Sequence, residues 1–182
     1  GKLSIRCSDT CEVAFHDVRV PQSNLVGVQG KGFYQLMEFF NRARLEGGAG
    51  LAIGTAQGAL EKAISHIKGR KAFGTTLAEN PVVQTKIAEM ATMLEAGRSL
   101  LYRAAANVDA GNTDHTLVAM AKWFTCEMAV KVADEAIQLH GGYGILEEYG
   151  VAHYWRDAKV LEIFEGTKEV EKIFIGKNML GK

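Results

Sequence analysis

A regular spacing of apolar and small residues in the middle of the chain constrains its fold more than any other feature. The intervals alternate between four and three residues along one series: Val83, Ile87, Met90, Leu94, Gly97, Leu101, Ala104 and Val108. This spacing places the whole series on one stripe of an α-helix, and such a stripe has to be buried against other helices. Pro81 precedes the series, where helices often begin, and Gly111 follows it. The series therefore predicts a long helix inside a bundle.

Further helical patterns lie on both sides of this series. Helices are expected over residues 33–68, from a cap at Thr113 or Asp114 to about Leu139, over residues 148–160, and after the N-cap candidate Thr167. Helices joined by short connections usually pack antiparallel. The sequence therefore predicts an all-α fold, an antiparallel four-helix bundle.

The first 27 residues have a strand pattern instead. Leu3 and Ile5 alternate with polar neighbours, and residues 12–20 alternate again, with one slip, until Pro21. We therefore expect a short β-strand remnant at the N-terminus. The first residues form no signal peptide and do not begin with Met, so we expect the chain to be an excised piece of a longer protein.

Charge and cysteine content argue against several classes of protein. The chain has 21 basic and 21 acidic residues, whereas nucleic-acid-binding and membrane-surface proteins usually have a basic excess. No apolar run approaches the length of a membrane span. Three cysteines without a Cys-x-x-Cys pair argue against a disulfide framework or a zinc site. The expected location is the cytoplasm, or the mitochondrial matrix in a eukaryote.

Several catalytic sites can also be excluded. A di-iron site in a helix bundle needs Glu-x-x-His pairs, and none of the five histidines has a glutamate three residues before it. The chain has no P-loop, and the glycines at 141–144 follow a predicted helix rather than a strand, so they do not form a dinucleotide fingerprint. No metal site is expected.

Glu165 is the strongest candidate for a functional side chain. It lies at a predicted turn, with Ile163 and Phe164 before it and Gly166 after it to permit a sharp bend. Apolar surroundings disfavour the charged form of a carboxylate and raise its pKa, which suits a general base. The alternative is a structural acid near the positive end of a helix dipole, and such acids are commoner. The spacing alone favours this alternative.

Two glycine-rich stretches also have two interpretations each. Gly50, Gly54 and Gly58 recur every fourth residue, which suits close helix packing and could also admit part of a ligand. Arg70 is followed by Phe73, which suits an anion beside a flat ring, although helix ends commonly carry basic residues and glycine. In both cases the structural interpretation is favoured.

Six stretches occur in a characteristic order: residues 6–10, 15–21, 69–74, 138–144, 155–159 and 164–167, with the sequences RCSDT, FHDVRVP, GRKAFG, QLHGGYG, WRDAK and FEGT. Together they resemble the acyl-CoA dehydrogenase family over nearly the whole chain. In that family a C-terminal four-helix bundle follows a middle β-domain. The resemblance implies that residues 1–28 are the last edge of the β-domain and that residues 29–182 are the helical bundle.

The resemblance implies FAD-dependent oxidation of an acyl-CoA thioester to the 2,3-enoyl-CoA. Glu165 matches the base that removes the α-proton, while flavin N5 accepts the β-hydride. A minority of the family carries the base on the long first helix, just before an arginine, but here that position is Ala43. Substrate-binding residues are expected at Asn41, Arg44, Phe164 and Gly166.

The same resemblance implies how the cofactor is held. Residues that match those holding the FAD of a neighbouring subunit are Arg70, Phe73, Gln138, Gly141 and Gly142. Thr167 matches a threonine that bonds FAD near the base. Sharing the cofactor implies a homodimer or a homotetramer. The other implied partners are the acyl-CoA substrate and electron-transferring flavoprotein as the electron acceptor; nucleic acid and membranes are not expected partners.

Two alternatives remain open. The chain could be a catalytically inactive helical module for oligomerisation or interaction, or it could belong to an enzyme of dicarboxylyl, aromatic or alicyclic thioesters, in which Gly47 and Gly48 widen the acyl pocket. Because most of the strands that hold the flavin ring are absent, we expect the chain alone to bind FAD weakly or not at all and to lack dehydrogenase activity.

Overall fold

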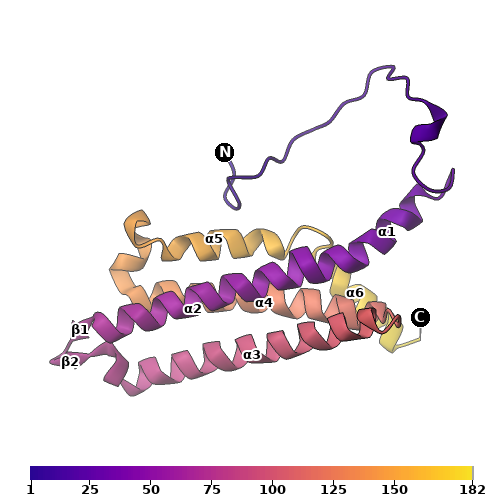
Figure 1. Ribbon diagram of the computed structural model, residues 1–182. Coiled ribbons are helices and arrows are strands. Elements are labelled where there is room, and N and C mark those ends of the chain that lie inside the picture. Colours follow the sequence, from indigo (N-terminus) through magenta and orange to yellow (C-terminus); the bar gives the residue numbers. More distant parts are fainter. Residues whose placement is uncertain (182) are drawn as a thin grey trace.

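The computed structural model describes residues 1–181 and shows a bundle of long helices (Figure 1). Its α-helices are α1 (Gly32–Ala43), α2 (Leu51–Gly69), α3 (Pro81–Asp109), α4 (His115–His140), α5 (Val151–Leu161) and α6 (Lys168–Met179). Helices α2 to α5 lie side by side with short connections and alternate in direction. The predicted antiparallel four-helix bundle is therefore confirmed.

Helix α4 lies at the centre of the bundle. It packs against α2, α3, α5 and α6, and it is buried on nearly every side. Small side chains let its neighbours approach closely; those with at most 1% exposure are Ala119, Ala121, Ala129, Ala133 and Ala136. The apolar interior forms one continuous cluster that includes residues from α2, α3, α4 and α5. Helices α2, α3, α5 and α6 are therefore arranged around α4.

The stripe predicted on α3 faces this core. Met90 and Ala104 have no exposed surface, and Leu94 and Leu101 are nearly as buried. Gly97 lies where a Cβ would come within 3.1 Å of Met128 Cε on α4. The boundary signals also hold: Pro81 is the first residue of α3, and the Asn80 side chain accepts a hydrogen bond of 2.9 Å from the Val82 amide.

The long helix predicted over residues 33–68 is present but is not uniform. Helices α1 and α2 run into each other through a π-helical segment, Arg44–Gly50. A π-helical turn is wider than an α-helical one, and such turns are frequent at functional sites. This segment carries Gly47 and Gly48.

The strand prediction for residues 1–27 was wrong. Within the described chain, residues 1–31 contain no strand, and their only regular element is a short 3₁₀ helix, Gln22–Asn24. The segment arches away from α1 and returns over α5 (Figure 1). The Ser4 hydroxyl donates to the Arg156 carbonyl, and the Ile5 amide donates to Asp157 Oδ1 at 2.7 Å. Strands need paired neighbours, and residues 1–27 find none within the described chain.

The strands that do form lie between α2 and α3. Strands β1 (Lys71–Ala72) and β2 (Thr75–Thr76) make a small antiparallel hairpin, in which Lys71 pairs with Thr76. The division of the chain at residue 28 remains a prediction.

The stripe of glycines on α2 faces α5 only in part. A Cβ on Gly58 would lie 2.6 Å from the Tyr154 ring, whereas a Cβ on Gly54 would meet no atom within 4 Å. Close helix packing therefore explains Gly58 but not Gly54.

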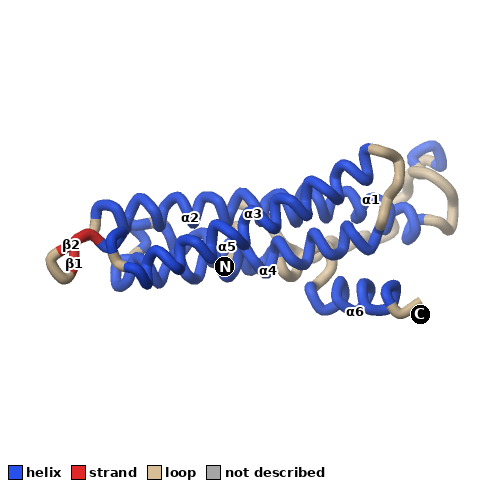
Figure 2. Tube along the Cα trace, turned by 90° about the horizontal axis from the view of Figure 1, so that it is seen from below, coloured by secondary structure: helices blue, strands red, loops and turns tan. Residues whose placement is uncertain are grey.

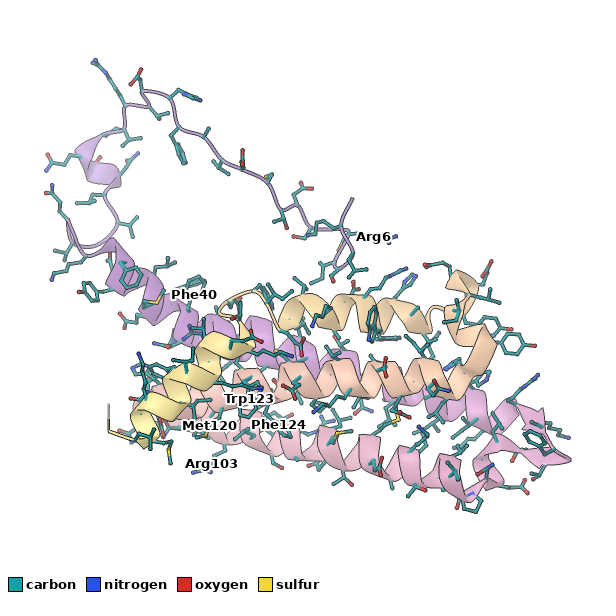
Figure 3. The ribbon with its side chains drawn as sticks, turned by 180° about the vertical axis from the view of Figure 1, so that it is seen from behind. Arg6, Phe40, Arg103, Met120, Trp123 and Phe124 are labelled. Carbon is teal, nitrogen blue, oxygen red and sulfur yellow. The ribbon has the colours of Figure 1, made fainter. Side chains whose placement is uncertain are left out.

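Helix α6 lies outside the bundle, against α4 (Figure 2). Met120 and Trp123 of α4 lie beside it (Figure 3). The Lys172 ammonium group lies 4.7 Å from the centre of the Trp123 ring. These contacts hold α6 and so fix one end of the turn that precedes it.

None of the helices within residues 1–181 is both long enough and apolar enough to cross a bilayer. The expected location of the protein stays a prediction.

Replacement of Met90 by alanine tests the buried stripe of α3. The variant Met90→Ala should lower the free energy of unfolding by about 2–5 kcal/mol because it leaves a cavity in the core. Met179→Ala is the control, since Met179 is 70% exposed and its loss should cost less than about 0.5 kcal/mol. Urea unfolding followed by circular dichroism measures both. Equal midpoints would contradict the predicted packing.

Candidate active site

The turn between α5 and α6 has an unusual backbone. Glu165 has φ of +56° and Gly166 has φ of +105°, a region that side chains other than glycine seldom adopt. Thr167 caps α6 as predicted, because its hydroxyl accepts a hydrogen bond of 3.4 Å from the Val170 amide. Helix α6 begins at Lys168, so Glu165 lies before its cap and outside its first turn. The strained turn directs the Glu165 side chain toward the π-helical segment.

The Glu165 carboxylate lies against two glycines of that segment. A Cβ on Gly47 would come within 2.9 Å of Glu165 Oε1, and a Cβ on Gly48 within 3.5 Å of Oε2. The absent side chain of Gly47 therefore makes room for the carboxylate rather than for an acyl group alone, whereas the Gly48 distance is an ordinary contact. Glu165 and Gly47 line a cleft of about 400 Å³ together with Phe39, Arg42, Ala43 and Glu46.

Charged side chains lie beneath the turn, although this region is largely closed to solvent. Lys122 of α4 has no exposed surface, and Glu171 of α6 is 1% exposed. Arg44 Nε lies 3.1 Å from Glu171 Oε1. The Arg44 Nε–H donates its hydrogen bond to the Glu165 carbonyl at 3.0 Å and not to Glu171. Within the described chain, the Glu171 Oε1 atom therefore has no hydrogen-bond partner, and Arg44 attracts the Glu171 carboxylate by charge alone.

The environment of Glu165 suits proton transfer. Burial raises the pKa of the Glu165 carboxyl above its usual value, while the positive charges of Lys122 and Arg44 partly oppose that rise. Among residues 1–181, Glu165 Oε2 is buried without a hydrogen-bond partner. An unpaired carboxylate oxygen with a raised pKa is able to accept a proton from a group placed in the cleft.

The four residues expected near the substrate surround the same turn. Arg44 contacts the Glu165 carbonyl, and its Nη1 donates to Asn41 Oδ1 at 3.4 Å. Phe164 packs against the core cluster. Gly166 leaves space for a neighbour, since a Cβ there would lie 2.3 Å from Glu171 Oε1.

A second cleft lies near the β1–β2 hairpin and has a volume of about 630 Å³. Arg70, Gln138, Gly141 and Gly142 all line it. The Arg70 guanidinium lies 5.2 Å from the centre of the Tyr143 ring. Phe73 does not line this cleft; it is fully exposed in the hairpin, with φ of +55°.

Two histidines form the inner wall of this second cleft. The rings of His66 and His140 are stacked with their centres 4.2 Å apart. Burial, then the charges of His140 and Arg70, lower the pKa of His66. The lowered pKa favours the neutral form of His66 beside the Arg70 guanidinium.

The β1–β2 hairpin and the turn between α5 and α6 lie toward opposite ends of the bundle (Figure 1), and each of the two clefts lies beside one of them. Helix α2 separates them, and its 19 residues span about 28 Å at 1.5 Å per residue. The structure therefore brings Glu165, Asn41, Arg44, Phe164, Gly166 and Thr167 together. It gathers Arg70, Gln138, Gly141 and Gly142 elsewhere.

Sequence reasoning missed the buried charges. Lys122 had a detectable signal, because it lies four residues from both Val118 and Cys126, which are buried on the same face of α4. A lysine on an apolar stripe needs a partner. Glu171 had no comparable signal, since an acid near the start of a helix is usually explained by the helix dipole. No cluster of potential metal ligands occurs within residues 1–181.

Comparison with known proteins identifies related sequences. The family described as "Acyl-CoA dehydrogenase, C-terminal domain" matches residues 30–180. A cyclohexane-1-carbonyl-CoA dehydrogenase of Geobacter metallireducens is 41% identical over 179 residues, which are 98% of this chain and 47% of that protein. A caffeyl-CoA reductase–Etf complex subunit of Acetobacterium woodii is 39% identical, over 100% of this chain and 48% of its own.

Solved structures are similar as well. The butyryl-CoA dehydrogenase of Megasphaera elsdenii superposes with a TM-score of 0.96 and 39% identity, over 99% of this chain and 47% of that one. The chain thus spans about half the length of the relatives it matches.

Two glycine replacements test the strained turn. Gly166→Ala should destabilise the chain by about 1–3 kcal/mol, because the added Cβ meets both the positive φ and the Glu171 carboxylate. Gly176→Ala in α6 is the matched control: no atom lies within 4 Å of its Cβ, so the better helix former should stabilise by about 0.5–1 kcal/mol. Thermal unfolding of both variants gives the comparison, and a neutral Gly166→Ala would refute this account of the turn.

Proposed function

This chain belongs to the acyl-CoA dehydrogenase family, and we propose that it supplies the catalytic base of a FAD-dependent enzyme that converts an acyl-CoA thioester into its 2,3-enoyl-CoA. The observation that carries the proposal is the Glu165 carboxylate, which lines a cleft and has a buried oxygen without a hydrogen-bond partner. Within residues 1–181, Glu171 also has a buried, unpaired oxygen, but Glu165 is the one of these two carboxylates that lines a cleft.

The residues around Arg70 fit part of a FAD molecule. The guanidinium suits a pyrophosphate group, and the Tyr143 ring, held beneath it, offers a flat surface. The backbone at Gly141 and Gly142 is open to close approach, since a Cβ at either position would meet no atom within 4 Å. Gln138 adds an amide to the same cleft. FAD, when bound, supplies the oxidising capacity by accepting the β-hydride of the substrate.

Glu165 would carry out the proton transfer. Its carboxylate removes the proton from the carbon beside the thioester carbonyl, and the electron pair left there forms the new double bond as the β-hydride departs. The thioester oxygen gathers negative charge in this step and needs aimed donors; the Glu165 backbone N–H is the proposed one. Arg44 donates to the Glu165 carbonyl and so restrains the backbone that carries the base.

The separation of the two clefts supports a shared cofactor. One FAD that contacts Thr167 near the base would have to take its Arg70 from another copy of the chain. Phe73, fully exposed in the hairpin, is available for such a contact. We therefore infer a homodimer or a homotetramer. Electron-transferring flavoprotein is the proposed acceptor, in keeping with the Etf complex named for the Acetobacterium woodii relative.

Replacement of Glu165 tests the proposed base. In the full-length protein, Glu165→Gln should lower kcat by about 10²–10⁴-fold, because glutamine cannot accept the α-proton. Flavin content should stay at the wild-type level. Glu169→Gln, an exposed acid in the first turn of α6, should leave kcat unchanged. If Glu165→Gln retained turnover with a panel of acyl-CoA substrates, the assignment of Glu165 as the base would be wrong.

Hybrid assemblies test the shared cofactor. Glu165→Gln and Arg70→Glu subunits should each be inactive alone. In a hybrid purified with two different tags, one site combines the intact Glu165 of one subunit with the intact Arg70 of the other, so activity should return. Reassembled wild-type subunits give the reference rate. An inactive hybrid with a normal subunit composition would mean that each site is built within a single chain.

A further inference from the structure

A fully buried lysine lies under the turn that carries Glu165, and the proton transfer itself does not require it. Lys122 Nζ donates a hydrogen bond of 2.5 Å to the Gly166 carbonyl. The stem of the side chain packs against the π-helical segment, since a Cβ on Gly48 would lie 3.1 Å from Lys122 Cγ. Lys122 therefore contacts both the turn and the segment that faces it.

A lysine in this position is energetically unfavourable for packing alone. Removal of an ammonium group from water costs free energy, and a methionine of similar size would fill the same space without that cost. Burial accordingly lowers the pKa of Lys122, while the negative charges of Glu171 and Glu165 oppose the change. The charge at this position therefore calls for an explanation beyond the filling of space.

Two cations hold consecutive carbonyl groups of the turn. Arg44 holds the Glu165 carbonyl, and Lys122 holds the Gly166 carbonyl. Because each peptide unit is planar, fixing the two carbonyls fixes both peptide planes between Glu165 and Thr167. A non-glycine residue with positive φ, as at Glu165, persists only when its surroundings impose that conformation.

We propose that Lys122 is a positioning residue for Glu165: by holding the Gly166 carbonyl from inside the bundle, it keeps the strained turn in the conformation that directs the carboxylate into the cleft against Gly47. The inference rests on the proposed role of Glu165 as the base. Lys122 also supplies a positive charge that favours the ionised, proton-accepting form of Glu165.

The groups around the carboxylate determine the expected pH effect. They are Arg44 from the π-helical segment, Lys122 and Cys126 from α4, and Glu171 from α6; Arg42 of α1 and Glu46 of the π-helical segment line the same cleft as the carboxylate. Burial raises the pKa of Cys126 to about 12, so its thiol is neutral. Lys122 lowers the pKa of Glu165 against the effect of burial. Loss of the Lys122 charge should therefore raise the pKa of Glu165 and move the acidic limb of kcat/KM to higher pH.

Lys122→Met in the full-length flavoprotein tests the proposal, with Lys131→Met as the control on the same helix. The Lys131 side chain is 61% exposed. Lys122→Met should lower kcat by about 10²-fold through misplacement of the base, with a smaller change in KM, and should shift the acidic limb upward. Hydrogen exchange of peptides covering residues 162–168 should become faster. Lys131→Met should behave as wild type in all three measurements.

A second variant separates positioning from simple charge balance. The double variant Lys122→Met/Glu171→Gln also removes the Glu171 carboxylate, whose negative charge would otherwise have lost the nearby positive charge of Lys122. The double variant should therefore be more thermally stable than Lys122→Met. The lowered kcat and the shifted acidic limb should persist. If kcat and the acidic limb both returned to their wild-type values in the double variant, the proposal would be overturned, because Lys122 would then serve only to neutralise the charge of Glu171. Unchanged exchange and an unshifted limb in Lys122→Met would also overturn it.

The exchange measurement does not depend on turnover, so the two proposals can fail separately. If Glu165→Gln keeps its activity, the base assignment fails, and faster exchange at residues 162–168 in Lys122→Met still supports the hold on the turn.

Discussion

The Glu165 carboxylate can lie against the helix that faces it only because residue 47 of that helix has no side chain. A methyl group at residue 47 would lie 2.9 Å from Glu165 Oε1, and one at residue 48 would crowd the Lys122 stem at 3.1 Å. These glycines lie in the π-helical segment, which also carries Arg44 to the Glu165 carbonyl. The direction of the base and the hydrogen bond that restrains it thus depend on one local widening of a long helix.

The buried charges are the energetic counterpart of this arrangement. Lys122, Arg44, Glu165 and Glu171 bring two positive and two negative groups into a space with little water. Such clusters seldom add stability, because desolvation opposes the attraction between the charges. The close packing of α4 against its neighbours offsets the cost. Proteins commonly accept locally unfavourable interactions at functional sites when the rest of the fold is consistent.

Local signals predicted most of the bundle. The stripe from Val83 to Val108, the proline at the start of α3 and the caps at Asp114 and Thr167 act through neighbours in the sequence, so they could be read without the fold. Strand pairing is not local, and residues 1–27 were misjudged for that reason. The partner of Lys122 is 44 residues away, so its burial could be suspected but its contact could not be named. The distance between Glu165 and Arg70 could not be predicted from the sequence either, because it depends on how the helices pack.

Cys126 lies beneath the same glycines, and its environment has a chemical consequence. Its thiol is fully buried and donates to the Gly48 carbonyl at 3.7 Å. With a pKa of about 12, it is present as thiolate only in traces at neutral pH. A conjugated thioester is a Michael acceptor, so a thiolate within reach of it would add to its β-carbon and be alkylated. The wall behind the carboxylate therefore contains sulfur in a form that is inert toward the product that the proposed reaction would release.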